Sequence, residues 1–412
     1  MKLKIELILK KSKFAFKVYS TVLNTLLRFI GLFIKTNPNL ILMNEYQGTK
    51  YNDSVRILFE AMVDDVRFNN REFIWAFARP SDFTIPRAKK IKIDTPEYFI
   101  TALKAGVWIT NVNIERGLKF KKRGTFYLNT WHSLTHFKAI GNAQGSRTDY
   151  DFSDVDLFLQ SVVEDTETKV KNFKVRSEAL KLYGLPRNDR LFENADSEKE
   201  KLKKKFGIPE NKKVILYAPT FRESTDGGKS RVLAPPIDLK KWEEQLSDDF
   251  VLIIRIHRLV TKIENLCFND FVLNFTDYPD INDLFIVADI MISDYSSVWF
   301  EYSILERPMI CFPFDYDGYM SKTGMTFDLK NDFTGLICNT DAQLLEAITS
   351  LKEDGNYQAE SEHTIKFKKR FIQTHGGATA ACLDEINTHI KMVGSSSTPQ
   401  ERFRNMNKER EK

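Results

Sequence analysis

Cysteine is scarce in this sequence of 412 residues. The chain has only four, far apart from one another: Cys267, Cys311, Cys338 and Cys382. Because none of them forms a CxxC pair, the sequence indicates neither a zinc site nor a disulfide framework. Cys311 also lies in an apolar stretch, so we expect a reduced, cytosolic environment.

Long uncharged apolar runs are also missing. Residues 14–34 are strongly apolar but contain Lys17, Asn24 and Arg28, whereas a membrane-spanning helix needs about twenty residues with few or no charges. No small-residue cleavage site follows, which argues against a secretory signal. The first 35 residues are rich in lysine and contain a single acid, Glu6. Residues 1–35 are therefore predicted to form an amphipathic helix at an anionic membrane surface. The alternative is a helix that packs on the protein's own core.

The composition is that of a folded protein. Hydrophobic residues make up 42% and charged residues 28% of the chain, which excludes a disordered protein. This length accommodates two domains, and no internal repeat is visible. The net charge is only +5. Because the basic residues gather at the N-terminus and not in a patch studded with aromatic residues, no nucleic-acid partner is predicted.

Short apolar runs alternate with helical patterns in two halves of the chain. The predicted strands are residues 39–43, 73–77, 107–110, 126–129, 157–159, 213–218, 250–255, 290–292 and 309–312. Helices are predicted over residues 53–64, 198–206 and 298–305. Such alternation favours βαβ crossovers and mostly parallel sheets. We expect domains at 36–195 and 196–393, with a cleft between the carboxyl ends of their strands, and a polar tail at 394–412.

The segment 280–319 is the most informative. A strand over 290–292 is followed by Asp294, Ser296 and Ser297, and then by a helix. The serines thus lie where a helix begins, and this position offers backbone N–H groups, the helix dipole and two hydroxyls to a phosphate. An ordinary serine N-cap is the alternative.

Four further polar clusters follow predicted strands or occupy rigid turns. They contain His132, Ser133, Thr135 and His136; Arg187; Pro219, Thr220 and Arg222; and Arg255 with His257. A histidine in such a turn suits a general base, and the arginines suit phosphate. Each cluster alone also fits a helix cap or a satisfied core group, but their common position at strand ends favours one anion-binding cleft.

At these residues the chain resembles a known family. The motifs TWHSLTHFKAIG (130–141), YGLPRND (183–189), ILYAPTFRE (215–223), RIH (255–257) and the segment 280–319 are similar to those of the CDP-glycerol:poly(glycerophosphate) glycerophosphotransferases. These are teichoic acid primases and polymerases and related capsule enzymes. The resemblance covers roughly residues 39–383. It implies an α/β, GT-B-like fold of two Rossmann-like domains, the first for the acceptor and the second for the CDP-polyol.

The resemblance also implies the reaction. Glycerol phosphate would pass from CDP-glycerol to a hydroxyl of an undecaprenyl-diphosphate-linked acceptor, with release of CMP, at the cytoplasmic face of the cell membrane. Open alternatives are a CDP-ribitol donor, a GT-B glycosyltransferase using a nucleotide sugar, and an inactive membrane-surface binding protein. A divalent cation at the pyrophosphate also stays open, although Asp151, Asp154 and Asp156 lack the glycine and spacing of a calcium loop.

Matching motifs assign roles residue by residue. The general base would be His132, and His257 would contact phosphate beside Arg255. The remaining positions that match substrate-binding motifs are Ser133, Thr135, His136, Arg187, Pro219, Thr220, Arg222, Asp294, Ser296, Ser297 and Glu301. Two departures concern the acceptor side and the pyrophosphate. The family's WHGTPLK motif has lost its glycine and proline here, and Arg258 replaces the proline of RMHP.

Overall fold

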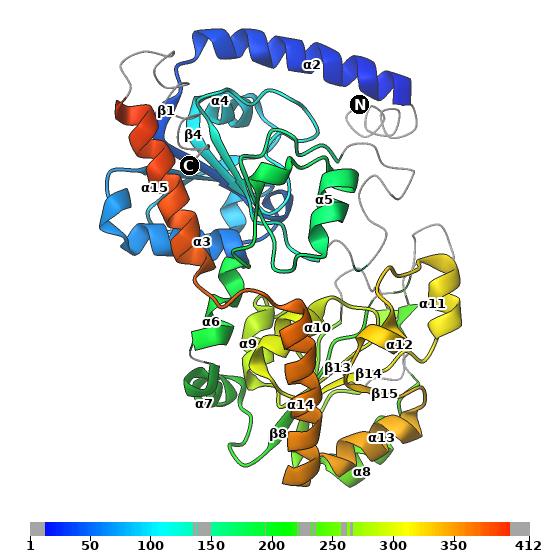
Figure 1. Cartoon of the computed structure of the whole chain (residues 1–412). Coiled ribbons are helices and arrows are strands. Elements are labelled where there is room, and N and C mark those ends of the chain that lie inside the picture. Colours follow the sequence, from blue (N-terminus) through cyan, green and yellow to red (C-terminus); the bar gives the residue numbers. More distant parts are fainter. Residues whose placement is uncertain are drawn as a thin grey trace.

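The computed structural model describes residues 13–134, 137, 150–193, 195–220, 222, 232–233, 236–256, 262–263 and 267–395. These residues form two α/β domains, one above the other in Figure 1, with the long helix α2 across the far side of the first. The chain passes from the first domain to the second through α6 and returns between α14 and α15.

The first domain is built on a sheet that has seven strands in the described part of the chain. They are β1 (Asn37–Asn44), β2 (Glu72–Phe77), β3 (Ala88–Lys92), β4 (Ala105–Thr110), β5 (Phe126–Asn129), β6 (Leu157–Leu159) and β7 (Leu180–Lys181). All neighbours pair in parallel, in the order β3-β2-β1-β4-β5-β6-β7. The apolar runs of β4 and β5 are buried along their whole length, as expected for strands covered on both faces.

Helices cover both faces of this sheet. They are α3 (Ser54–Asp64), α4 (Pro96–Lys104) and α5 (Asp165–Phe173). The Asp53 side chain caps α3 by accepting the Ser54 backbone N–H at 2.5 Å. Thr95 caps α4, with Pro96 in the first turn. Both starts use groups that satisfy otherwise unpaired N–H donors at a helix N-terminus.

Helix α2 (Lys13–Phe33) packs on the first domain through one face. Leu27 joins the core that contains the buried side of α4, and Gly31 lies against Leu103. The Lys119 backbone fixes the helix from the side: its N–H donates to Asn24 Oδ1 at 2.7 Å, and its carbonyl accepts Arg28 Nε at 2.8 Å. Among the described helices, none combines the length and the apolar character needed to cross a membrane.

The second domain repeats the arrangement of the first. Its main sheet comprises, within the described residues, β8 (Lys213–Tyr217), β10 (Phe250–Ile254), β12 (Val272–Asn274), β13 (Ile290–Ser293), β14 (Met309–Cys311) and β15 (Leu336–Ile337). The order is β12-β10-β8-β13-β14-β15, again all parallel. In chain order, both sheets begin 3-2-1-4, which is the Rossmann arrangement. A separate ladder pairs β9 (Val232–Leu233) with β11 (Lys262–Ile263).

Helices also flank this second sheet. They are α6 (Asp189–Glu193), α7 (Ala195–Phe206), α8 (Leu239–Leu246), α9 (Ile281–Val287), α10 (Val298–Tyr302), α11 (Tyr316–Lys322), α12 (Leu329–Asp332), α13 (Asp341–Ser350) and α14 (Asp354–Phe371). The predicted helix over 298–305 is α10 followed by a 3₁₀ turn at Ser303–Leu305. Each strand and helix predicted between residues 39 and 312 lies at its expected place, within a few residues at the ends. Of the predicted N-terminal helix, residues 13–33 form α2, and residues 1–12 lie outside the described residues.

The last helix, α15 (Ala378–Ser395), does not stay with the second domain. Cys382, Leu383 and Ile386 pack into the core between α3 and the first sheet, as Figure 1 shows for the red helix beside α3. Asp189 ties the two crossings together, because its carboxylate accepts the first two backbone N–H groups of α15 at 2.9 and 2.8 Å. Residues 378–393, which the sequence analysis grouped with the second domain, therefore extend the first.

Candidate functional site

A cleft of about 810 Å³ lies between the two domains, where the carboxyl ends of both sheets meet. Its lining includes loops that follow β1 and β5 in the first domain and β8, β10 and β13 in the second. In each sheet the strand order reverses beside the central strand, β1 or β8, and ligands of such folds bind at this point. The cleft thus occupies the position that the strand order favours for a ligand.

His132 lies in this cleft with one of its ring nitrogens already engaged. The Nδ1 atom is 2.8 Å from the Asn111 carbonyl oxygen. Because a carbonyl only accepts, the neutral ring carries its proton on Nδ1 and leaves the lone pair on Nε2. Burial lowers the pKa of His132 below its ordinary value, although the Asn111 hydrogen bond and the charge of Asp53 raise it. A neutral imidazole with a basic Nε2 is therefore the form present at neutral pH.

A closed ring of hydrogen bonds surrounds this histidine. Asn111 holds the ring through its carbonyl and, through Oδ1, accepts the Tyr46 backbone N–H at 2.8 Å. The Tyr46 hydroxyl donates to Asp53 Oδ2 at 2.6 Å, and its ring lies 5.2 Å from the imidazole centroid. Asp53 Oδ2 also accepts Arg187 Nη1 at 2.6 Å, and Arg187 Nη2 donates to the His132 carbonyl at 3.2 Å. Backbone and ring of His132 are thus both held in place.

Arg187 connects the hydrogen-bonded residues around His132 to the second domain. Its Nε and Nη2 atoms donate to the two carboxylate oxygens of Glu301 at 2.9 and 2.7 Å. The two side chains are only 10% and 13% exposed, so this bidentate pair is largely removed from solvent. Burial alone would lower the pKa of Arg187, but Asp53 and Glu301 outweigh it and raise that pKa well above its usual value. The guanidinium is therefore a charged link between the domains.

The loop after β1 is rigid and strained. Its residues 46, 47 and 48 all have positive φ, at 44°, 57° and 79°. Gly48 packs so tightly that an added Cβ would lie 2.7 Å from the Ala78 nitrogen. The buried Glu45 carboxylate closes the loop by accepting the Asn52 and Asp53 backbone N–H groups at 2.8 and 3.0 Å. Burial, and then the charge of Asp53, raise the pKa of Glu45 to about 8. Strain of this kind is typical of functional sites.

The opposite wall comes from the second domain. Pro219 and Thr220 after β8, Arg255 after β10, and Ser296 and Ser297 after β13 all line the cleft. Ser297 is the N-cap residue of α10, yet its side chain makes no capping hydrogen bond. These residues supply hydroxyls and a guanidinium, which are groups that bind phosphate oxygens.

Two predicted substrate-binding residues hold this wall from behind. Asp294 is 1% exposed, and its Oδ1 accepts the Thr220 backbone N–H at 2.8 Å. Arg222 donates to Asp294 at 2.9 Å and, through two nitrogens, to Asp315 at 2.7 and 2.9 Å. It also lies over the ring of Tyr295, 5.1 Å from the centroid. Neither Asp294 nor Arg222 is among the residues that line the cleft. They instead position Thr220 and the turn that contains Ser296 and Ser297, here called the serine turn.

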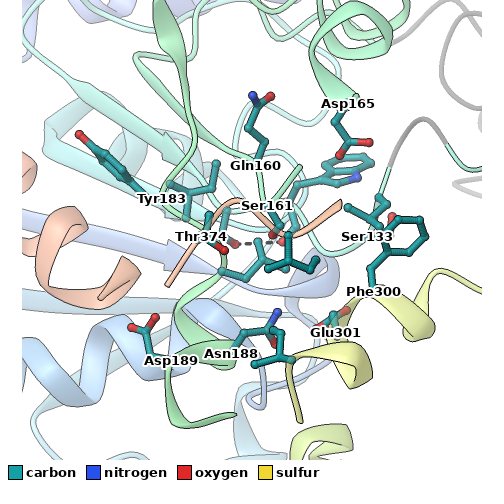
Figure 2. Close-up of a pocket in the computed structure, with 18 of the residues that line it drawn as sticks. Ser133, Gln160, Ser161, Asp165, Tyr183, Asn188, Asp189, Phe300, Glu301 and Thr374 are labelled. Atoms are coloured by element: carbon teal, nitrogen blue, oxygen red, sulfur yellow. Dashed lines mark hydrogen bonds between the residues drawn. The ribbon is translucent and has the colours of Figure 1, made fainter. Parts of the chain in front are cut away.

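A second, partly enclosed cavity of about 20 Å³ lies beside the cleft, between the first domain and α10. Ser133 and Glu301 belong to the lining of both hollows. Figure 2 shows Gln160 and Asp165 on one side of this cavity, with Asn188 and Glu301 on the other. This volume holds about one water molecule, so the space is too small for a substrate.

Most of the predicted residues therefore meet in one place. His132, Ser133, Arg187, Pro219, Thr220, Arg255, Ser296, Ser297 and Glu301 line the cleft. Thr135, His136 and His257 lie outside the described residues. Arg187 and Glu301, which were expected to bind substrate, bind each other. In the described part of the chain, no group of three histidine, cysteine or acidic side chains is arranged for a metal ion.

Four further residues of the site, Tyr46, Lys50, Asp53 and Asn111, were not predicted from the sequence. Tyr46, Lys50 and Asp53 line the cleft, and the Asn111 backbone carbonyl holds the imidazole. A signal was present, since they follow the predicted strands at 39–43 and 107–110. The strand-end argument that identified the other clusters applies to these residues equally.

Comparisons with known proteins identify the family of this chain. Residues 26–385 match the model of the family described as CDP-Glycerol:Poly(glycerophosphate) glycerophosphotransferase. A teichoic acid poly(glycerol phosphate) polymerase of Bacillus spizizenii is 28% identical, over 93% of this chain and 100% of that protein. A polymerase of the same description from Staphylococcus epidermidis is 29% identical over 86% of this chain, which spans only 51% of that longer protein.

A solved structure shows the same fold. The wall teichoic acid polymerase TagF, as a histidine-to-asparagine variant soaked with CDPG, superposes with a TM-score of 0.79 and 27% identity. The match covers 91% of this chain and 96% of that one. The predictions of the family, of the glycerophosphotransferase class and of the GT-B-like fold are thereby confirmed.

Proposed function

Because the chain belongs to the CDP-glycerol:poly(glycerophosphate) glycerophosphotransferase family, we propose that it transfers glycerol phosphate from CDP-glycerol to a hydroxyl of a lipid-linked acceptor, with release of CMP. The observation that carries this proposal is the geometry of His132. Its Nδ1 is bound to Asn111, and the residue lines a cleft whose other wall holds Ser296 and Ser297. A base for a hydroxyl and a wall for phosphate thus lie across the same cleft.

The proposed step is an in-line displacement at phosphorus. Nε2 of His132 takes the proton of the acceptor hydroxyl, and the oxygen attacks the β-phosphorus of CDP-glycerol. The bond from this phosphorus to the bridging oxygen breaks, and CMP leaves with the electron pair. Thr220, Ser296, Ser297 and Arg255 stabilise the charge on the phosphates. Phosphoryl transfer depends mainly on such positioning and charge stabilisation.

Replacing His132 tests this assignment. We expect His132→Ala to lower kcat about 10²- to 10⁴-fold, the usual contribution of a general base, while the Kd of CDP-glycerol stays within about two-fold. The value of kcat is measured from CMP release and from transfer of labelled glycerol phosphate to a lipid-linked acceptor. The Kd of CDP-glycerol is measured by calorimetry. His363→Gln is the matched control, because His363 lies on α14, 41% exposed and outside the cleft lining. Near-normal turnover of His132→Ala would refute the role of this base.

A donor screen tests the substrate class. CDP-glycerol, CDP-ribitol and UDP-sugars are compared under one condition, with CMP or UDP release as the signal. Release of CMP from CDP-glycerol supports the proposal. Preference for CDP-ribitol or for a UDP-sugar would replace it with one of the alternatives, and no release from any donor with acceptor present would favour a binding protein without activity.

We also propose that the protein binds the cytoplasmic face of the cell membrane through α2. The outer face of α2 exposes a continuous set of apolar side chains: Val18, Tyr19, Val22, Leu26, Phe29, Leu32 and Phe33. Leu32 and Phe33 are 79% and 76% exposed. A large apolar face on a helix with basic neighbours is typical of helices that lie in the membrane interface.

Vesicle sedimentation tests this second proposal. The double substitution Leu26→Glu and Phe29→Glu places two charges on the exposed face and should release the protein from vesicles of anionic phospholipid. Val66→Glu, on the 3₁₀ turn after α3, is the control, because Val66 is 79% exposed elsewhere. Equal binding of the double variant and the control would exclude α2 as the anchor.

A further inference from the structure

Lys50 is a cation on the first-domain wall of the cleft to which the proposed chemistry gives no role. It lies on the strained loop after β1, half-buried, and it lines the cleft. Its Nζ atom lies 4.4 Å from the centroid of the Tyr46 ring, and that ring is 5.2 Å from the imidazole of His132. Burial lowers the pKa of His132 most, followed by the positive charge of Arg187 and then, least of the three, by that of Lys50. Lys50 and His132 thus both neighbour the Tyr46 ring.

Among the described residues, three other charged groups beside His132 together carry a net negative charge. Arg187 is matched by Asp53 at 2.6 Å and by Glu301 at 2.7 Å, so these three groups together carry one negative charge. An anionic substrate group is repelled from this cluster and attracted to Lys50. The wall therefore separates into an acidic part, suited to hydroxyls, and a basic position at Lys50, suited to a phosphate.

The loop can hold such a group in a fixed place. Its backbone is closed by Glu45, and the ring of Tyr46 supports the lysine ammonium through a cation–π contact. A cation that is held in advance binds an anion at a smaller entropic cost than a freely moving lysine.

The proposed function supplies the ligand. An acceptor that ends in glycerol phosphate presents a terminal hydroxyl, and its last phosphodiester follows three carbons away. If the hydroxyl is at His132, this phosphodiester lies within one repeat unit of the same wall. In the proposed function the donor is bound mainly by the other wall, which Thr220, Ser296 and Ser297 line.

We propose that Lys50 binds the phosphodiester of the acceptor's terminal glycerol phosphate unit and so selects acceptors that already carry such a unit. This inference rests on the proposed function, since it takes the acceptor to be a polyol phosphate chain. The same chemistry would also suit the diphosphate of the donor, so the experiment separates the two sources.

The experiment compares Lys50→Gln, Lys50→Arg and the control Lys92→Gln, where Lys92 is exposed on β3 outside the cleft lining. Each protein is titrated with a fluorescent tri(glycerol phosphate) chain and, separately, with the same label on glycerol that lacks phosphate. Loss of one charge-assisted contact should raise the Kd of the phosphorylated chain about ten-fold in Lys50→Gln. Lys50→Arg should retain most of the affinity, and Lys92→Gln should match the wild type.

The outcomes distinguish this inference from the proposed function. Binding of the chain is measured without donor, so the result for Lys50 does not depend on which donor the protein uses. The identity of the donor is decided separately, by the donor screen. An unchanged Kd in Lys50→Gln would overturn the inference, as would an equal loss for the glycerol without phosphate. A raised KM for CDP-glycerol with unchanged chain binding would assign Lys50 to the donor instead. Thermal melting of each variant verifies that the fold is intact.

Discussion

The link between Arg187 and Glu301 gives the sharpest test of how the two domains are held. Glu301→Gln keeps the shape of the side chain but removes its charge and replaces one acceptor oxygen with an amide donor. In the native site, both oxygens accept from the guanidinium, at 2.9 and 2.7 Å, and both side chains are nearly buried. The amide would face a guanidinium N–H, so one hydrogen bond is lost outright.

The expected cost follows from this geometry. Hydrogen bonds to charged groups contribute about 1.5–3 kcal/mol, and removing one partner of a buried ion pair costs about 3–5 kcal/mol. Asp53 still pairs with Arg187 after the substitution, so we expect a loss of about 2–3 kcal/mol in the free energy of unfolding. We also expect kcat to fall about ten-fold or more, because Arg187 holds the His132 carbonyl.

Urea denaturation and CMP release measure the two effects. A double-mutant cycle with Arg187→Gln and Glu301→Gln isolates the pair, and variants are compared only where their denaturant slopes agree. The matched control is the pair of Lys368 and Glu306, 2.7 Å apart with Glu306 45% exposed. An exposed pair of this kind contributes about 0–1 kcal/mol.

Two outcomes would contradict the proposed role of this pair. If Glu301→Gln costs no more than Glu306→Gln and leaves kcat unchanged, Arg187 and Glu301 neither join the domains nor support the base. A loss of stability with unchanged kcat would retain the interdomain link and exclude the support of His132.

Two further predictions concern the base and the serine turn. Since burial lowers the pKa of His132 below 6.5 and only the neutral ring accepts a proton, kcat/KM should be constant near neutral pH and fall on acidification below about pH 6.5; an acid limb above pH 7 in the pH–rate profile would contradict this. Ser297→Ala should raise the KM for CDP-glycerol but change stability by less than about 0.5 kcal/mol, because the hydroxyl caps nothing. Thr340→Ala removes a capping box from α13, so it should lower the free energy of unfolding by about 1 kcal/mol and leave the KM for CDP-glycerol unchanged. Urea denaturation measures the stability of both variants, and donor kinetics measure their KM.

The sequence predicted those parts of the site that depend on short-range order. Strand ends were visible as apolar runs broken by polar residues, and the parallel order of the sheets brought these ends together. His132, Thr220 and Ser297 therefore lie in one cleft, as predicted. For these residues, the place directly after a strand in the sequence was enough to predict the place in the cleft.

The partners of the charged side chains could not be predicted in this way. Arg187 is bound by Asp53, 134 residues earlier in the chain, and by Glu301, 114 residues later. Arg222 is not among the residues that line the cleft, and Asp294 and Asp315 hold its guanidinium. A pattern of single residues shows where a charge is placed in the chain but not which of several nearby carboxylates it meets.

The packing of α15 on the first domain could not be predicted from the sequence either. The apolar positions of α15 indicate that it packs on something, but they do not say on which domain. Only the arrangement of the chain, with Asp189 joined to the start of α15, decides this.

The packing of α15 on the first domain has a consequence for folding during synthesis. During translation the first sheet emerges from the ribosome long before α15, and the whole second domain is made in between. The groove that Cys382 and Ile386 later fill stays open throughout that time. The domain made first is thus the one finished last, and a chain that stops before residue 378 would leave an apolar surface on it uncovered.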